Sequence, residues 1–185
     1  GFKELEGIHS RTDFDLAAHE KFSGRKLQYF DPERNETYVP YVVETSVGLD
    51  RLFLAIFSNC LKDEVLEDGS ERTVLTLPPA LAPVKAAILP LMKKDGLGEY
   101  GEKIFNDLKY DFNVIYEEKD SIGKRYRRQD AIGTPFCITV DHDSLTDNTV
   151  TLRDRDTMKQ ERVAVADLRR IIDEKTNFRN LLQKI

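Results

Sequence analysis

The chain passes from a strand into a helix within the stretch Glu44-Thr45-Ser46-Val47-Gly48-Leu49-Asp50-Arg51. Residues 38–43, which precede it, are rich in β-branched and aromatic side chains and predict a strand. After Gly48, apolar residues recur at the i, i+3, i+4 and i+7 spacing of a helix with one buried face. Because side chains alternate along a strand, Glu44, Ser46 and Gly48 are expected to share one face.

Arg51 falls in the first turn of that helix. The helix dipole disfavours a cation there unless an anion binds nearby, and a helix N-terminus beside a guanidinium is a good polyphosphate site. We therefore expect Glu44 and Arg51 to face one shared cleft. A surface Glu–Arg pair beside a helix cap is the alternative that this short stretch leaves open.

The composition is that of a soluble globular protein, with 185 residues, 40% hydrophobic and 33% charged. This length allows one large domain or two small ones, with a substantial core. Cys60 and Cys137 lie in apolar runs and are predicted to be buried thiols in a reducing compartment. The cysteines and the scattered histidines show no ligand spacing, so we expect no structural metal site.

Two further features of the sequence concern membrane insertion and the first residues of the chain. No apolar run approaches the ~20 residues that span a bilayer, and no signal peptide opens the chain. The first residues, 1–8, begin almost inside a predicted strand and lack a starting Met. We therefore expect the chain to be a piece of a longer protein.

Charge is unevenly distributed along the chain. The net charge of −5 argues against a nonspecific nucleic-acid binder. Basic side chains nevertheless gather within residues 124–128. A local basic patch on an acidic protein predicts a selective, salt-sensitive contact with a polyanion. A solvated helix face is the other interpretation of the same residues.

Two blocks are predicted along the chain. Residues 62–72 are polar, contain Gly69-Ser70 and predict a loop, and residues 73–77 predict a short strand. We place the domain boundary here, with a first domain at residues 1–72 and a second at residues 73–185.

The second block alternates strands with helices. Strands are predicted at residues 84–91, 113–117 and 136–140, and helices at residues 96–110 and 121–132. This alternation predicts right-handed βαβ units around a parallel core. Residues 149–154 and 160–165 predict an antiparallel pair, and a last helix is expected from about residue 166. The expected fold is α/β, with a five-stranded mixed sheet and about three flanking helices.

Three signatures follow one another in the chain. The opening stretch has the form Glu-x-Ser-x-Gly-x-x-Arg and resembles motif 3 of class II aminoacyl-tRNA synthetases, in its glycyl version. Residues 4–16 resemble the segment before that motif, and residues 121–136 are similar to the anticodon-binding domain of glycyl, histidyl, prolyl and threonyl synthetases. The resemblance covers essentially the whole chain. It implies the C-terminal part of a bacterial-type homodimeric glycyl-tRNA synthetase, with the end of an antiparallel-sheet catalytic domain followed by an anticodon-binding domain.

The resemblance also implies a role for individual residues. The family activates glycine with ATP to an adenylate and transfers the glycyl group to tRNA(Gly). By resemblance, the Glu44 carboxylate meets the glycine ammonium, and Arg51 is the catalytic cation over the adenine and triphosphate. The implied glycine-binding residues are Glu44, Thr45, Ser46, Val47 and Gly48. The implied ATP-binding residues are Glu4, Leu5, Gly48, Leu49, Asp50 and Arg51.

Other implied contacts involve metal and RNA. Glu4 matches a ligand for Mg²⁺ bound to the ATP phosphates, although a solvent-facing carboxylate on a strand is the simpler interpretation. The implied tRNA-binding residues are Lys124, Arg125, Tyr126, Arg127 and Arg128. From the residues themselves, we expect Arg11 to pair with Asp13 and brace a loop, and Asp15 to open a helix. The expected partners are tRNA(Gly), glycine and ATP in a cytoplasmic homodimeric parent, without a membrane, DNA or a prosthetic group.

Class II synthetases also need motifs 1 and 2, and nothing before Glu4 supplies either. We therefore expect the chain to be inactive by itself. The alternative is a noncatalytic nucleic-acid-binding protein on the same fold, such as a polymerase accessory subunit. Survival of Glu44, Ser46, Gly48 and Arg51 favours the enzyme. A free-standing tRNA-binding module would leave the first block without a use.

Overall fold

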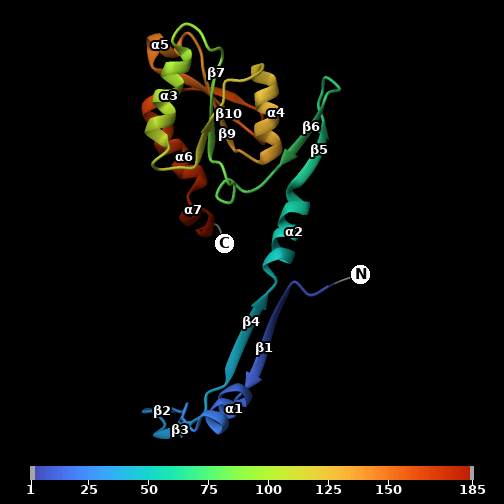
Figure 1. Ribbon diagram of the computed structural model, residues 1–185, viewed down its shortest axis with the longest axis vertical. Helices are drawn as coiled ribbons and strands as arrows, with labels where there is room; N and C mark the ends of the chain where they lie inside the picture. Colours follow the sequence, from blue (N-terminus) through green and yellow to red (C-terminus); the bar gives the residue numbers. More distant parts are fainter. Residues whose placement is uncertain (1–2, 184–185) are drawn as a thin grey trace. The chain divides into compact units, whose positions relative to one another are not determined.

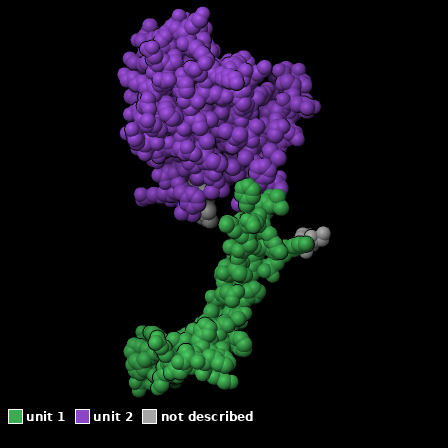
Figure 2. Space-filling view, viewed as in Figure 1, with its two compact units in different colours: residues 1–55 green, residues 56–185 purple. Residues whose placement is uncertain are grey.

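A computed structural model describes residues 3–183 of the chain (Figure 1). The chain divides into two compact units, residues 1–55 and residues 56–185 (Figure 2). The boundary expected at residue 72 falls inside strand β6 (Glu71–Leu75), which belongs to the second unit. Where the two domains divide in the family stays a prediction.

The first unit is built on a two-stranded antiparallel ribbon. Strand β1 (Glu6–Thr12) pairs with β4 (Val42–Val47), and helix α1 (Phe14–Ser23) follows β1. Strands β2 (Tyr29–Asp31) and β3 (Glu36–Tyr38) form a separate hairpin. After β4 the chain enters helix α2 (Leu49–Cys60), as its apolar spacing predicts.

The strand expected at residues 38–43 is wrong in its limits. Tyr38 ends β3, and β4 begins only at Val42. Pro40 lies between them and has no N–H to donate to a ladder, which explains the interruption. Glu4 likewise precedes the first residue of β1, so it does not share a strand face with Glu6.

In the second unit, the end of α2 is followed by a hairpin that the sequence did not predict. Residues 61–65 form β5 (Leu61–Val65), which pairs antiparallel with β6. The loop expected over residues 62–72 is therefore confined to the turn at residues 66–70. The sequence did not predict β5 because its side chains are mostly polar and exposed, and the strand is stabilised by pairing with β6.

The centre of the second unit is a five-stranded mixed sheet with the order β11-β10-β9-β7-β8. Its parallel core is β7 (Ala86–Pro90) between β8 (Val114–Tyr116) and β9 (Phe136–Val140). Strands β10 (Thr149–Asp154) and β11 (Gln160–Ala164) extend it antiparallel. This confirms the α/β class and the mixed sheet expected from the sequence.

Helices cover both faces of this sheet (Figure 1). On one face, Ile88 and Ile138 pack against α3 (Leu97–Leu108) and α6 (Leu168–Thr176). On the other face, Ala87, Leu89 and Cys137 pack with Ile122 and Tyr126 of α4 (Ile122–Ile132). Both cysteines are buried free thiols, as predicted.

The last part of the chain differs from the single helix expected from residue 166. It comprises a 3-10 turn, η1 (Val165–Asp167), then α6 and the short α7 (Phe178–Leu182). Asn177 separates the two helices with an extended backbone, at φ −68° and ψ 127°. A further short helix, α5 (Ser144–Asp147), lies between β9 and β10 and was not predicted. Among the described residues, no helix has the length and apolarity to cross a bilayer.

Candidate functional site

The register of the first ribbon places four polar or bare positions on one face. Ser46 lies opposite Gly7, and Glu44 lies opposite His9. Cross-strand partners project to the same side of a sheet, so these residues share a face. Gly7 is buried, and a Cβ added there would collide with the imidazole of His9. The ribbon therefore presents a carboxylate, a hydroxyl and an imidazole around a backbone position without a side chain.

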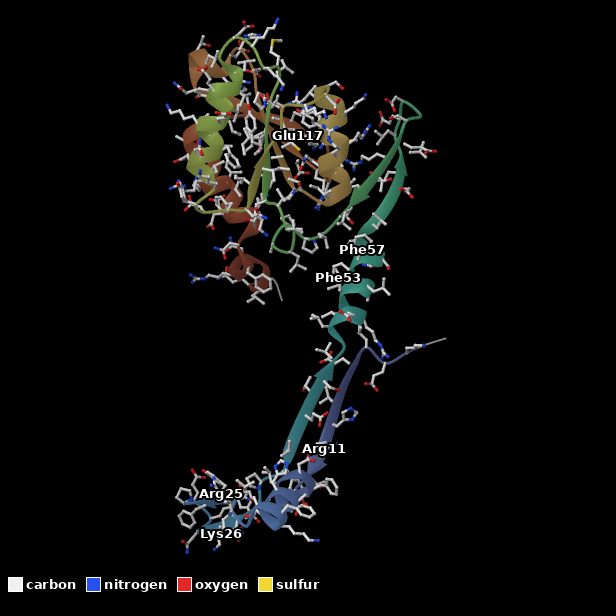
Figure 3. The ribbon with its side chains drawn as sticks, viewed as in Figure 1. Arg11, Arg25, Lys26, Phe53, Phe57 and Glu117 are labelled. Carbon is white, nitrogen blue, oxygen red and sulfur yellow. The ribbon has the colours of Figure 1, made fainter. Side chains whose placement is uncertain are left out.

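Arg11 completes this face. Its guanidinium donates two hydrogen bonds to Asp15, both 2.8 Å long, and its Nε lies 3.4 Å from Oε2 of Glu44. Figure 3 shows Arg11 where β1 ends and α1 begins. The pairing expected between Arg11 and Asp13 is wrong, because Asp15, four residues after Arg11, accepts both bonds. Asp15 does lie in the first turn of α1, as predicted.

The pKa values of this pair follow from its geometry. The hydrogen bond from Arg11 lowers the pKa of Asp15, and that bond, together with the charges of Asp15 and Glu44, raises the pKa of Arg11. Both charges are therefore present at neutral pH. Arg11 keeps about two fifths of its side chain exposed and Glu44 somewhat more, so a small ligand can reach both groups.

Sequence reasoning missed Arg11 and His9 as members of this face. The signal for His9 is its alternation with Gly7 along β1, which matches the alternation of Glu44 with Ser46 along β4, whereas Arg11 lies at an irregularity of the ladder between Ser10 and Thr12. That signal becomes readable only once the register is known, since a shift by one residue would turn each side chain to the other face.

The residues expected to contact ATP gather at the start of α2. The side chain of Arg51 lies against Gly48, and its Nη1 donates a 2.7 Å hydrogen bond to the carbonyl oxygen of Glu4. The Gly48 N–H donates to the carbonyl oxygen of Leu5 at 3.4 Å. The segment before β1 is thus fastened across the N-terminus of α2. Glu4 takes part through its backbone, and its side chain is exposed.

The remaining predicted residues of this stretch differ in position. Thr45 and Val47 lie on the opposite face of β4 from Glu44, so they can reach a ligand bound beside Glu44 only through backbone groups. Leu49 and Asp50 are exposed in the first turn of α2. A common cleft for Glu44 and Arg51 stays a prediction. Within residues 3–183, no cluster of three or more His, Cys, Asp or Glu side chains is placed to hold a metal ion.

The predicted RNA-contacting residues of α4 are mostly engaged inside the second unit. Arg125 is 1% exposed and donates to the carbonyl oxygens of Pro90, Glu117 and Leu91. Burial lowers the pKa of this guanidinium, and its Nε finds no hydrogen-bond partner among residues 3–183. Arg125 therefore ties α4 to the strand ends rather than facing solvent.

Tyr126 and Arg128 are also held by neighbours. The Tyr126 hydroxyl hydrogen-bonds that of Thr139 at 2.6 Å, and the guanidinium of Arg153 stacks 4.8 Å from the ring centroid. Arg128 is ion-paired with Glu117, which Figure 3 places beside α4, and with Asp120. Of the five predicted residues, Lys124 is exposed and Arg127 is partly exposed.

A buried ionic cluster lies beneath α4. Asp130 is fully buried and accepts two hydrogen bonds from Arg153, at 2.8 and 3.0 Å, and one from Arg72 at 3.3 Å. Arg72 is 3% exposed and also donates to Glu64 of β5. Although burial lowers the pKa of Arg153, the bonds and charge of Asp130 raise it on balance.

The chain matches the anticodon binding domain family over residues 85–175, which span the five-stranded sheet and α6. The RNA-binding domain of threonyl-tRNA synthetase from Cryptosporidium parvum has a similar fold, with a TM-score of 0.68 and 21% identity. That match covers 94% of this chain and 39% of the solved one.

Curated relatives show much higher identity. The chain is 57% identical over 163 residues to the glycine–tRNA ligase of Chlorobaculum tepidum, covering 88% of this chain and 34% of the ligase. It is 54% identical to that of Macrococcus caseolyticus (96% and 38%) and 51% identical to that of Treponema denticola (97% and 41%). The chain thus spans about two fifths or less of the ligases it matches, and over that span it belongs to the glycyl-tRNA synthetase family.

Proposed function

We propose that the chain acts as part of a glycine–tRNA ligase, which activates glycine with ATP and transfers the glycyl group to tRNA(Gly). One observation carries this proposal, namely the opposite charges of Arg11 and Glu44 on one ribbon face, 3.4 Å apart. Free glycine is a zwitterion. Its carboxylate suits the guanidinium of Arg11, and its ammonium suits the carboxylate of Glu44.

The crowding around Gly7 supports selection of the smallest amino acid. The His9 imidazole lies against the Cα of Gly7 on the same face as Ser46 and Glu44. A side chain on the substrate would have to displace one of these groups. Rejection by a filled site is effective, because larger substrates lose contacts as well as space.

The start of α2 supplies the nucleotide side of the reaction. Arg51 is exposed and tethered to the Glu4 carbonyl, so its charge stays at the helix N-terminus, where phosphates bind well. During adenylate formation the guanidinium would neutralise charge on the departing pyrophosphate. ATP enters with Mg²⁺ as substrate, and the exposed Glu4 carboxylate fits a metal that keeps most of its ligands from water and phosphate.

The second unit would bind the tRNA. The match to an anticodon binding domain over residues 85–175 supports this role. On α4, Lys124 and Arg127 remain the best placed of the predicted contacts. We further propose that the complete ligase is a cytoplasmic homodimer, and that the present chain alone does not exchange pyrophosphate into ATP.

The test compares two carboxylates on the same ribbon in the complete ligase that carries this chain. Glu44→Gln should reduce glycine-dependent ATP–pyrophosphate exchange by about tenfold or more, chiefly through the KM for glycine. Glu6→Gln is the matched control, because Glu6 lies opposite Val47 on the other face. Equal effects of both changes would refute the site. If neither changed adenylate formation while tRNA binding persisted, the noncatalytic alternative would stand.

A further inference from the structure

The hairpin β5–β6 (residues 61–75) begins directly where α2 ends. The carbonyl oxygen of Cys60, the last residue of α2, accepts hydrogen bonds from both the N–H and the hydroxyl of Thr76, at 2.8 and 2.9 Å. Cys60 itself is buried. The end of the helix that starts beside Arg51 is therefore fastened to the base of this hairpin.

The hairpin is in turn docked on α4. Strand β6 packs against that helix (Figure 1), and its residues Val74 and Leu75 are buried. Gly133, which ends α4, has a left-handed backbone with φ 83°. A Cβ at Gly133 would approach the Leu75 carbonyl oxygen to 3.0 Å. The close approach of β6 to the end of α4 thus requires glycine at position 133 for two reasons, its left-handed backbone conformation and the lack of space for a side chain.

Arg72 is the polar centre of this docking. It links three parts of the unit, since it donates to Glu64 on β5, to Asp130 on α4 and to the carbonyl oxygen of Arg155 after β10. Asp130 also holds Arg153, so the hairpin and the sheet share one buried carboxylate. Buried ion pairs add little net stability compared with apolar packing, but they specify one geometry. The cluster therefore specifies how the hairpin lies on α4 within the second unit.

We propose that the docked hairpin is a coupling element and that Arg72 is a positioning residue for transfer of the glycyl group to tRNA. The inference rests on the proposed function. A tRNA held by the second unit must bring its 3′ end to the site at Glu44 and Arg51, and the chain leads from that site into the second unit through α2, whose end is bonded to the base of this hairpin. Loosening the hairpin frees the end of α2 and lowers the fraction of time in which the 3′ end is correctly placed.

Adenylate formation uses only glycine and ATP, so it does not depend on that placement. The two half-reactions therefore separate coupling from local damage. In the complete ligase, Arg72→Met should lower kcat for tRNA charging by about tenfold to 100-fold, and should leave glycine-dependent ATP–pyrophosphate exchange within about twofold of wild type.

Two further variants separate a positioning role of Arg72 from a general loss of folding. Arg72→Lys keeps a cation near Asp130 and removes the paired bonds to Glu64, so it should fold and show an intermediate charging defect. Thr73→Val is the control, because Thr73 lies next to Arg72 on β6 but is exposed, and its hydroxyl donates to the exposed Asp63. The charging rate of this variant should stay within about twofold of wild type.

Three results would overturn the proposal. Parallel losses in both half-reactions for Arg72→Lys would show that Arg72 acts only on folding. Unchanged charging in a folded Arg72→Met ligase would show that docking is irrelevant to transfer. If the wild-type ligase formed no glycyl adenylate, the proposed function itself would fall, and this inference with it.

Discussion

Asp130→Asn is expected to destabilise the second unit strongly. The carboxylate is fully buried and accepts hydrogen bonds of 2.8 and 3.0 Å from Arg153, which is 4% exposed. In the variant, an amide N–H₂ faces guanidinium donors, and Arg153 keeps an uncompensated buried charge. Breaking a buried pair in this way costs about 3–5 kcal/mol.

Urea unfolding of the 185-residue chain, followed by far-UV circular dichroism, measures this loss. With a slope of about 2 kcal/mol per molar urea, the midpoint of the second unit should fall by about 1.5–2.5 M. Arg127→Met, at the exposed end of the same cluster, should cost under about 0.5 kcal/mol.

The double variant Asp130→Asn with Arg153→Met tests the physical cause. Removing the stranded cation should recover more than half of the loss, because methionine can still pack on the Tyr126 ring that the guanidinium now covers. A loss below about 1 kcal/mol for Asp130→Asn, or no recovery in the double variant, would refute the argument from uncompensated charge.

Two other predictions concern single positions in the second unit. Gly133→Ala should lower the free energy of unfolding by about 1–3 kcal/mol in thermal unfolding, since Gly133 has a φ of 83° and a Cβ there would crowd the Leu75 carbonyl oxygen. Gly123→Ala is the control, because a Cβ at this position in α4 meets open space, and it should be neutral or slightly stabilising. A larger loss for Gly123→Ala than for Gly133→Ala would contradict this. Burial, aided by the hydrogen bond to Glu118, raises the pKa of Tyr116 to about 12. Its stabilisation is therefore complete below the unfolded pKa of about 10 and is lost as pH rises toward 12, which an absorbance titration against Tyr116→Phe would show; a native midpoint near 10 would contradict it.

Local pattern was enough for much of the fold. The helix from Leu49, the strand at residues 136–140 and the strand at residues 149–154 follow the expected limits, because apolar periodicity reports the faces that tertiary packing buries. The alternation of strands and helices was likewise enough for the mixed sheet. The family followed from spaced motifs, because the ordered spacing of Glu44, Ser46, Gly48 and Arg51 is more specific than apolar periodicity.

Tertiary contacts determined features that the apolar periodicity of the sequence does not predict. Polar strand β5 exists because β6 pairs with it, and Arg72, within residues expected to be a loop, became a buried link to α4. The charges of α4 showed the same limit, because sequence alone cannot tell Lys124 in solvent from Arg125 beneath the strand ends.

The candidate glycine site shows the division most clearly. Sequence by itself marked Glu44 and Ser46 through their alternation on one strand and their match to a motif. Only the pairing of β1 with β4 brought His9 opposite Glu44, and Arg11, at an irregularity of the same ladder, within 3.4 Å of it, from positions more than thirty residues away. The physical reason is that a strand's own sequence sets which side chains alternate, whereas the hydrogen-bonded partner strand sets which of them meet.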